Sequence, residues 1–342
     1  MKRLLLALPA LLVAMIATSS AALGCAGLIG PNGAVNLIRT TTFAGYHDGV
    51  EHYVTSFQFS GGSGQFGSLV PLPGVPTKVE RGGDWTLQRL VRETEPQKAV
   101  GFQLNAPRAA FSDAQVLLTA KIDALDITIL KGGGPEVGRW ATEHGFRLPP
   151  DAPEALDHYA ERSPIFMAAI FDADAAKARG QRVGDGTPVH LTIPLDAPWV
   201  PLRILALGKQ ADARVNADVY LLTDKRPALL PAPRANGMEI THSAAATASL
   251  LGDLRSDKGM DWVPQDAWLT KVRIDAAASQ LRYDLAVDAF GRSPSRVAAG
   301  LEPPATPAAP DTTLPSALLL TAITLASGGA LLFATRTARR VA

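Results

Sequence analysis

Two apolar runs stand near the ends of the sequence, and the longer one is Leu314 to Ala334. This run contains no charged residue and is followed by Arg336, Arg339 and Arg340. A helix of this length, at about 1.5 Å per residue, would measure about 31 Å, close to the roughly 30 Å hydrocarbon thickness of a bilayer. The pattern predicts one C-terminal transmembrane helix with a basic tail on its cytoplasmic side.

The N-terminal run has the layout of a secretory signal peptide. Lys2 and Arg3 precede an apolar stretch, which is followed by small residues that would allow cleavage after Ala22 or Gly24. The alternative is an uncleaved first membrane span, but the apolar stretch is short for one. Both ends therefore predict the same topology, with the middle of the chain outside the cytoplasm.

Between these runs, alternating apolar and polar positions predict strands. The clearest pair is 34–43 and 50–59, joined by Asp48-Gly49, a dipeptide typical of two-residue hairpin turns because both positions adopt positive φ. The register would pair Gly45 with His52. One face of the second strand would then point into the core, with Tyr53, Thr55, Phe57 and Phe59.

Further strands are predicted along the rest of the chain. They cover residues 68–73, 114–130 with a phase change near Asp123 and Ala124, 165–171, 190–195, 202–207, 215–223, 268–275 and 281–288. The last two alternate cleanly, which predicts antiparallel neighbours with one face in water, the face that carries Lys271 and Asp284. Short helices are predicted from an N-cap at Asp84, over 136–144, and from a capping box at Asp151 and Glu154.

Strands that follow strands, with a few short helices, favour an α+β fold built mostly of antiparallel sheet. A segment rich in Pro and Ala then predicts a stiff stalk before the membrane. The expected organisation is a signal peptide (1–24), an exported α+β domain (25–290), the stalk (291–313), the transmembrane helix (314–335) and the cytoplasmic tail (336–342).

Charge and cysteine content narrow the classes of partner. The formal net charge of +1 gives no electrostatic basis for binding nucleic acid. The lone cysteine, Cys25, has no partner for an internal disulfide. It lies directly after the export signal, so we consider a lipidated cysteine and a free thiol, and favour the free thiol because Ala22 stands where a lipoprotein signal usually has leucine.

Candidate chemistry is sparse, and the sequence predicts no catalytic residue and no cofactor. His47 and His52 fall on one face of the predicted hairpin and are the only weak metal candidates, although a third ligand would be needed. The alternative is a pair of exposed polar residues. Five tryptophans predict either an exposed binding cluster or core packing. The loop 227–237 is where we first expect a binding surface.

Several strings of residues together resemble a known family. They are CAGLIGPNG from Cys25, YHDGVEHYVTSFQF from Tyr46, VPLPGVPTKVERGGDWTLQRL from Val70, WATEHGFRLPPDAPEALDHYAERSPIF from Trp140 and VPLRILALG from Val200. The chain is similar to the bacterial family called domain of unknown function 2330 from Cys25 to about Asp288. The resemblance implies an exported domain and supplies no activity, substrate or site residue.

Three functional hypotheses follow. The first is a membrane-anchored, non-enzymatic module outside the cytoplasm that binds an envelope protein or surface component. The second is an envelope hydrolase or metal-dependent enzyme whose site assembles from scattered Asp, Glu and His. The third is an assembly subunit that associates through its membrane helix, where Ala322, Ala326 and Ala330 share one face.

Overall fold

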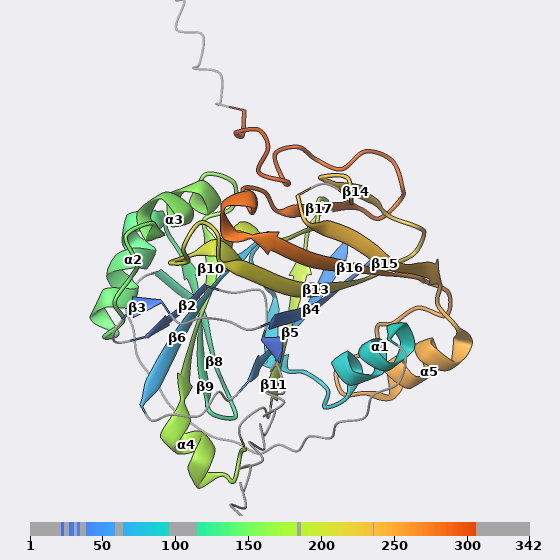
Figure 1. The fold of residues 1–342 in the computed structure, drawn as a ribbon. Coiled ribbons are helices and arrows are strands. Elements are labelled where there is room, and N and C mark those ends of the chain that lie inside the picture. The colour runs from blue at the N-terminus through green and yellow to red at the C-terminus, as the bar shows by residue number, and fades with distance from the viewer. Residues whose placement is uncertain are drawn as a thin grey trace, which may run out of the picture. The chain divides into compact units, whose positions relative to one another are not determined.

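The structure is a computed structural model, shown in Figure 1. It describes residues 39–58, 64–95, 115–182, 186–234 and 236–305, and the short strands at 22–23, 27–30 and 33–34. The chain divides into two compact units, Met1–Pro303 and Pro304–Ala342. All the elements below belong to the first unit.

Within the described residues the strands form three sheets. The eight-stranded sheet has the order β15 (Met238–Ala245), β16 (Trp268–Ala277), β13 (Arg214–Thr223), β4 (Arg39–His47), β5 (Val50–Gln58), β11 (Gly186–Pro194) and β7 (Lys78–Arg81), with β1 (Ala22–Leu23) pairing β4. The six-stranded sheet has the order β3 (Gly33–Ala34), β2 (Gly27–Gly30), β6 (Gln65–Leu72), β10 (Ile165–Asp172), β9 (Leu125–Lys131) and β8 (Gln115–Ile122). The small sheet consists of β12 (Trp199–Val200), β17 (Leu285–Asp288) and β14 (Ala228–Leu230).

The helices are short. They are α1 (Thr86–Thr94), α2 (Gly134–Glu143), α3 (Ala152–Ala160), α4 (Ala173–Ala178) and α5 (Ala248–Ser256), with 3₁₀ turns η1 (Arg203–Ala206) and η2 (Ala278–Gln280). Strand pairing is antiparallel except where β4 meets β13 and β1. The predicted α+β class with mostly antiparallel sheet is therefore confirmed.

The two large sheets pack face to face, and each carries helices on its outer face. Figure 1 shows α2 and α3 beside the six-stranded sheet and α1 and α5 beside the eight-stranded one. Neighbouring residues of a strand consequently point into different cores, because side chains alternate across a sheet. Tyr53 packs in the core between the sheets, whereas Val54 packs under α1 and α5.

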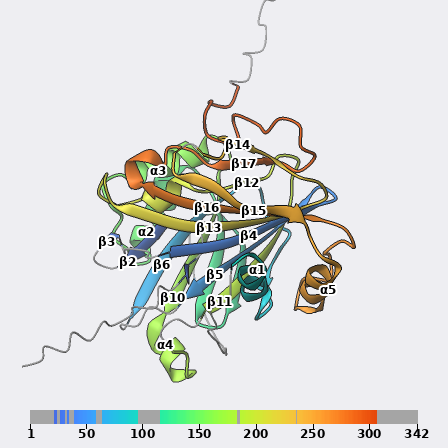
Figure 2. The same ribbon diagram turned by 45° about the vertical axis from the view of Figure 1, so that its right-hand side comes forward.

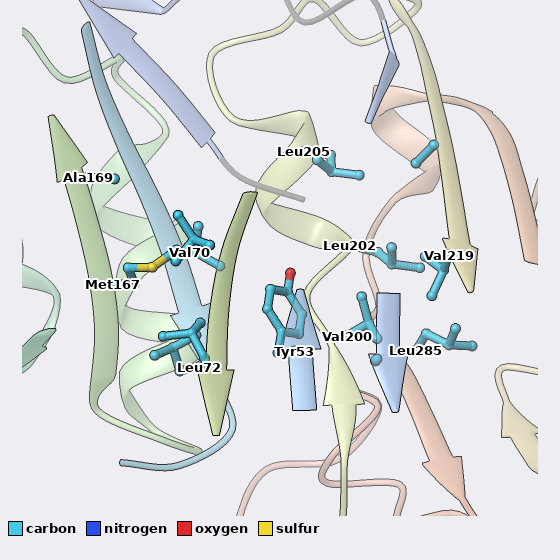
Figure 3. Close-up of a cluster of buried hydrophobic side chains, with 14 of the residues drawn as sticks. Tyr53, Val70, Leu72, Met167, Ala169, Val200, Leu202, Leu205, Val219 and Leu285 are labelled. Carbon is cyan, nitrogen blue, oxygen red and sulfur yellow. The ribbon is translucent and has the colours of Figure 1, made fainter. Parts of the chain in front are cut away.

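Figure 3 shows part of the core between the sheets, where β6 and β10 contribute Val70, Leu72, Met167 and Ala169. The other face of the six-stranded sheet packs against α2 and α3 through Leu130 and Phe166. Both large sheets are thus covered on both faces. This explains why a central strand such as β10 (IFMAAIFD) reads as apolar on nearly every position rather than on every second one.

The predicted hairpin is confirmed in its register. Strands β4 and β5 pair Gly45 with His52 and His47 with Val50, around a turn in which Asp48 and Gly49 have φ of 49° and 75°. Tyr53 and Thr55 are buried as expected. The side chains of Phe57 and Phe59 lie outside the described residues.

Two strand predictions are wrong, and one is refined. Residues 203–206 form η1 instead of a strand. Strands β16 and β17 are not neighbours, because β13 and β15 occupy both edges of β16 while β17 lies in the small sheet. The phase change at Asp123 and Ala124 is a complete hairpin turn between β8 and β9, in which Asp123 has φ of 55°.

The predicted caps of two helices also differ. The cap of α1 comes from a distant segment: Asp257 accepts hydrogen bonds from the backbone amides of Asp84, Trp85 and Thr86. Asp151 does precede α3, but its carboxylate accepts from the amide of Gly208 rather than closing a capping box.

The first compact unit extends into the segment expected to be a stalk. Ala298 and Ala299 are buried against the core that includes α3, and the unit ends at Pro303. Apolar burial and the hydrogen bond from the amide of Asp284 to the carbonyl of Ala299 hold this segment on the domain. The covalent link between this unit and residue 314 is therefore residues 304–313.

Candidate functional site

A pocket of about 160 Å³ opens at one end of the domain. We call it the end pocket. It lies between the turn that follows β11 and the segment that follows β17, beside the end of β4. Its lining consists of Tyr46, Asp196, Ala197, Pro198, Val287, Asp288, Ala289, Phe290, Arg292, Ser293, Pro294 and Ser295.

Backbone hydrogen bonds build the walls of the end pocket. The amide of Val287 donates to the carbonyl of Pro198 at 3.0 Å, which joins the two walls. The carboxylate of Asp288 accepts from the amide of Phe290 at 2.9 Å and turns the chain outward. Gly291 completes this turn with φ of 74°, a conformation that favours glycine.

The side chains of the end pocket mix one cation, two carboxylates and two aromatic rings. The Arg292 guanidinium lies 5.0 Å from the centre of the Phe290 ring and 3.6 Å from the Asp288 carboxylate. Burial, followed by the charges of Asp196, Glu51, Asp224 and Asp288, raises the pKa of Tyr46. The Tyr46 hydroxyl therefore stays protonated at neutral pH and donates to the carbonyl of Leu195 at 3.0 Å.

Glu51 on β5 pairs with Tyr46 on β4, and its carboxyl group is buried, with the residue 1% exposed. Neither of its oxygens has a hydrogen-bond partner among the described residues. Burial raises its pKa to about 8. The group is therefore mostly neutral at pH 7, and ionising it would place an unpaired charge in the core.

The two metal candidates from the sequence have different partners. His47 Nδ1 lies 2.6 Å from a carboxylate oxygen of Asp224, at the end of β13. His52 Nδ1 lies 3.0 Å from Nε2 of His190 on β11. Within the part of the chain that the structure describes, no group of three or more His, Cys, Asp or Glu side chains could hold a metal ion.

His52 and His190 form a neutral imidazole pair that the sequence did not predict. Burial lowers the pKa of His52 to about 3 and that of His190 to about 4. The ring of Trp262 stacks on His52 with centroids 3.8 Å apart and planes 4° from parallel. The two rings meet because β5 pairs with β11. A prediction that these two strands are neighbours would have placed the two rings close together.

Gly45 makes the Trp262 stack possible, and its replacement gives a first test of this packing. A Cβ at residue 45 would lie 2.1 Å from Cη2 of Trp262. We expect Gly45→Ala to lower the free energy of unfolding by about 1 to 3 kcal/mol, because an overpacked site forces the ring to move. Chemical denaturation measures this change.

Gly252 of α5 offers the matched control, since a Cβ there meets nothing within 4 Å. Gly252→Ala should leave stability unchanged or raise it by up to about 1 kcal/mol, the helix propensity difference. Equal stability of the two variants would contradict the packing described for Gly45.

A buried polar network surrounds Asp284, which the alternating pattern had assigned to a wet face. This residue is 0% exposed. Its carboxylate accepts from the Tyr159 hydroxyl and the Leu202 amide, each at 2.7 Å, and pairs with the Arg162 guanidinium. Burial alone would raise the pKa of Asp284, but the nearby His158 imidazole, the Arg162 charge and the Tyr159 hydroxyl outweigh burial and lower it.

The contacts of the Asp284 network stabilise the fold. It joins α3, η1 and the start of β17, and it also explains why the chain turns at residues 202–206, since the amides of Leu202 and Arg203 donate to the carboxylate. Arg162 donates further to the carbonyl of Ala298 at 2.8 Å and lies over the Trp199 ring. Every strong polar contact of this cluster is made within the domain.

The five tryptophans form no exposed cluster. Trp140 and Trp199 are buried, and Trp85, Trp262 and Trp268 are half-buried. The loop 227–237 contains β14 and a turn in which Arg234 and Asn236 have positive φ.

Other predicted site residues lie outside the described residues. They are Cys25 and the membrane anchor marked by Leu314, Ala334, Arg336, Arg339 and Arg340. Among the described helices, none is long and apolar enough to cross a bilayer.

The fold was also compared with solved structures, and the matches have low sequence identity and low TM-scores. A mutated baculovirus P35 after caspase cleavage has a TM-score of 0.38 and 8% identity, covering 75% of this chain and 98% of that one. Baculovirus P35 itself has a TM-score of 0.35 and 9% identity, covering 74% and 91%. These scores are too low to carry an argument about function. No curated protein matches the chain.

A family model matches most of the chain. The family of uncharacterized proteins conserved in bacteria, DUF2330, matches residues 19–286. This range includes both large sheets and Asp284, and it agrees with the resemblance found in the sequence. The chain belongs to the DUF2330 family.

Proposed function

We propose that this chain is an exported, single-pass protein of the cell envelope whose α+β domain is a binding module, with the end pocket as its binding site. The observation that supports this binding site is a difference in exposure: side chains at the end pocket are exposed, whereas the polar groups of the buried networks are not. Phe290 is 51% exposed and the Arg292 side chain 73% exposed. Asp284 and Asp257, in contrast, accept hydrogen bonds from backbone amides of the domain itself.

The proposed location is supported by the sequence. The signal-like residues 1–24 and the apolar run followed by Arg336, Arg339 and Arg340 favour a domain outside the cytoplasm with its C-terminus inside. Reporter fusions test this topology. A phosphatase that is active only outside the cytoplasm should be inactive when fused after Ala342, and active when fused after Pro303 with residues 304–342 removed. The opposite pattern would overturn the proposed location.

The binding role is tested by site-specific photo-crosslinking in cells. A photoreactive residue at Asp196, in the end pocket, should form adducts, whereas one at Lys177 should not. Lys177 lies on α4, which Figures 1 and 2 place at the end of the molecule opposite β14 and β17. Its side chain is 48% exposed, which makes it a matched control. Equal adducts at both positions, or none at Asp196, would contradict the proposal.

A further inference from the structure

We infer that the face around the end pocket docks on the phospholipid headgroups of the membrane that holds the chain, with Phe290 entering the interfacial layer. This inference rests on the proposed function, because it assumes that residues 314–335 span that membrane. It adds the chemical class of the ligand at the same site. The face consists of the turn after β13 (224–226), the turn after β11 (196–198) and the segment from 288 to 302.

The first argument is the length of the chain. The compact unit ends at Pro303, so residues 304–313 connect it to the span. Ten residues reach at most roughly 35 Å when fully extended. Pro303 therefore lies within roughly 35 Å of the start of the proposed span. Figures 1 and 2 place β14, β17 and the segment after β17 at the same end of the domain.

The second argument is the kind of side chain exposed there. Of the large hydrophobic side chains in the described part of the chain, Phe290 is the most exposed, at 51%. Leu301, in the same segment, is 39% exposed. An exposed aromatic ring on a turn suits the boundary between headgroups and acyl chains. Exposed apolar side chains rimmed by polar ones are typical of an interaction site.

The third argument is charge. Arg292 covers the Phe290 ring, and Lys225, Arg226 and Arg296 are also exposed on this face. A Cβ at Gly291 would lie 3.0 Å from the carbonyl oxygen of Arg226, so the two turns are in contact. Arginine can bind a lipid phosphate through two parallel hydrogen bonds.

The acidic residues of the face are compatible with this ligand. Asp288 is paired with Arg292, Asp224 with His47, and Glu302 with Arg296. Asp196 is exposed at the rim of the end pocket. Phospholipid headgroups that carry both a phosphate and an ammonium group would satisfy this mixed set of charges.

The test uses the full chain in vesicles of phosphatidylethanolamine and phosphatidylglycerol. Cys25 is replaced by serine, and a single cysteine at Ser293 or at Lys177 carries an environment-sensitive fluorophore. Spin-labelled lipid should quench the label at residue 293 and leave the label at residue 177 unquenched. Ser293 is exposed and reports on Phe290 without removing it.

A second variant tests Phe290 itself. Phe290→Ser, added to the Ser293→Cys chain, should lower the ratio of docked to undocked domain by about tenfold, because the ring no longer leaves water. Circular dichroism should show the same fold in all variants. Quenching at residue 293 that does not change with Phe290→Ser would overturn the inference.

Alkaline extraction of the vesicles separates this inference from the proposed function. A chain that washes off the vesicles contradicts the proposed anchor. A chain that stays anchored but shows no lipid quenching at residue 293 contradicts docking alone. Protection of residue 293 from an aqueous quencher without lipid quenching would indicate a protein partner or a second copy on this face, and would also overturn the inference.

Discussion

Asp284→Ala is expected to destabilise the domain by about 3 to 5 kcal/mol, because it leaves the Arg162 guanidinium buried without a counter-charge. The Arg162 side chain is 4% exposed, so water has little access to replace the lost carboxylate. The Tyr159 hydroxyl and the amides of Leu202 and Arg203 lose their acceptor in the same variant. Urea denaturation followed by tryptophan fluorescence measures the change.

Glu302→Ala provides the control, since it breaks an ion pair with Arg296 in which both side chains are about half exposed. The loss there should be below about 1 kcal/mol. If Asp284→Ala is too unstable to purify, Tyr159→Phe removes the hydrogen bond donated to Asp284 and the one accepted from the Ile204 amide, and should still cost about 1 to 3 kcal/mol. Unfolding midpoints for Tyr159→Phe and Glu302→Ala that match the wild type would show that the network contributes little.

The sequence predicted the local parts of the fold well. The Asp48-Gly49 turn set the register of β4 and β5, because a two-residue turn leaves one pairing. The helix over 136–144 was also predicted, and His144 at its end stacks on Trp140 with centroids 3.9 Å apart. These features depend on residues close together in the chain.

Long-range contacts account for the errors. The pattern around Asp284 alternates like that of a half-exposed strand, yet α3 and η1 cover its polar side. Lys271 was also expected in water, but it is 0% exposed, with Nζ 2.6 Å from Glu95 and 5.2 Å from the centre of the Tyr220 ring. Alternation shows which residues share a face, and it does not show what packs on that face.

The end pocket could not be predicted for the same reason. Its walls come from segments about 90 residues apart in the chain, around Asp196 and Asp288, and none of them carries a known motif. The sequence pointed first to residues 227–237, which pair with β17 through β14 and lie next to this region. None of residues 227–237 lines the end pocket, and a binding surface there stays a prediction.

Glu51 gives the second large expected effect, an increase in stability on mutation. Glu51→Gln should stabilise the domain by on the order of 3 kcal/mol at pH 7, because the amide removes an ionisable group whose charged form is disfavoured in the core. The folded-state pKa of about 8 lies above the ordinary value of 4.5. Wild-type stability should therefore fall as the pH rises from about 4.5 to about 8.

Urea denaturation at several pH values between 5 and 9 tests this expectation. The contribution of Glu51 is fully present below its ordinary pKa and is lost as the pH rises through the folded-state pKa. The gain from Glu51→Gln should consequently be small at pH 5, grow with pH and level off above about pH 8. Glu239→Gln, which changes an exposed carboxylate on β15, should produce no such trend. A gain that is equally large at pH 5 and pH 9 would mean that packing, and not the charge of Glu51, determines the difference.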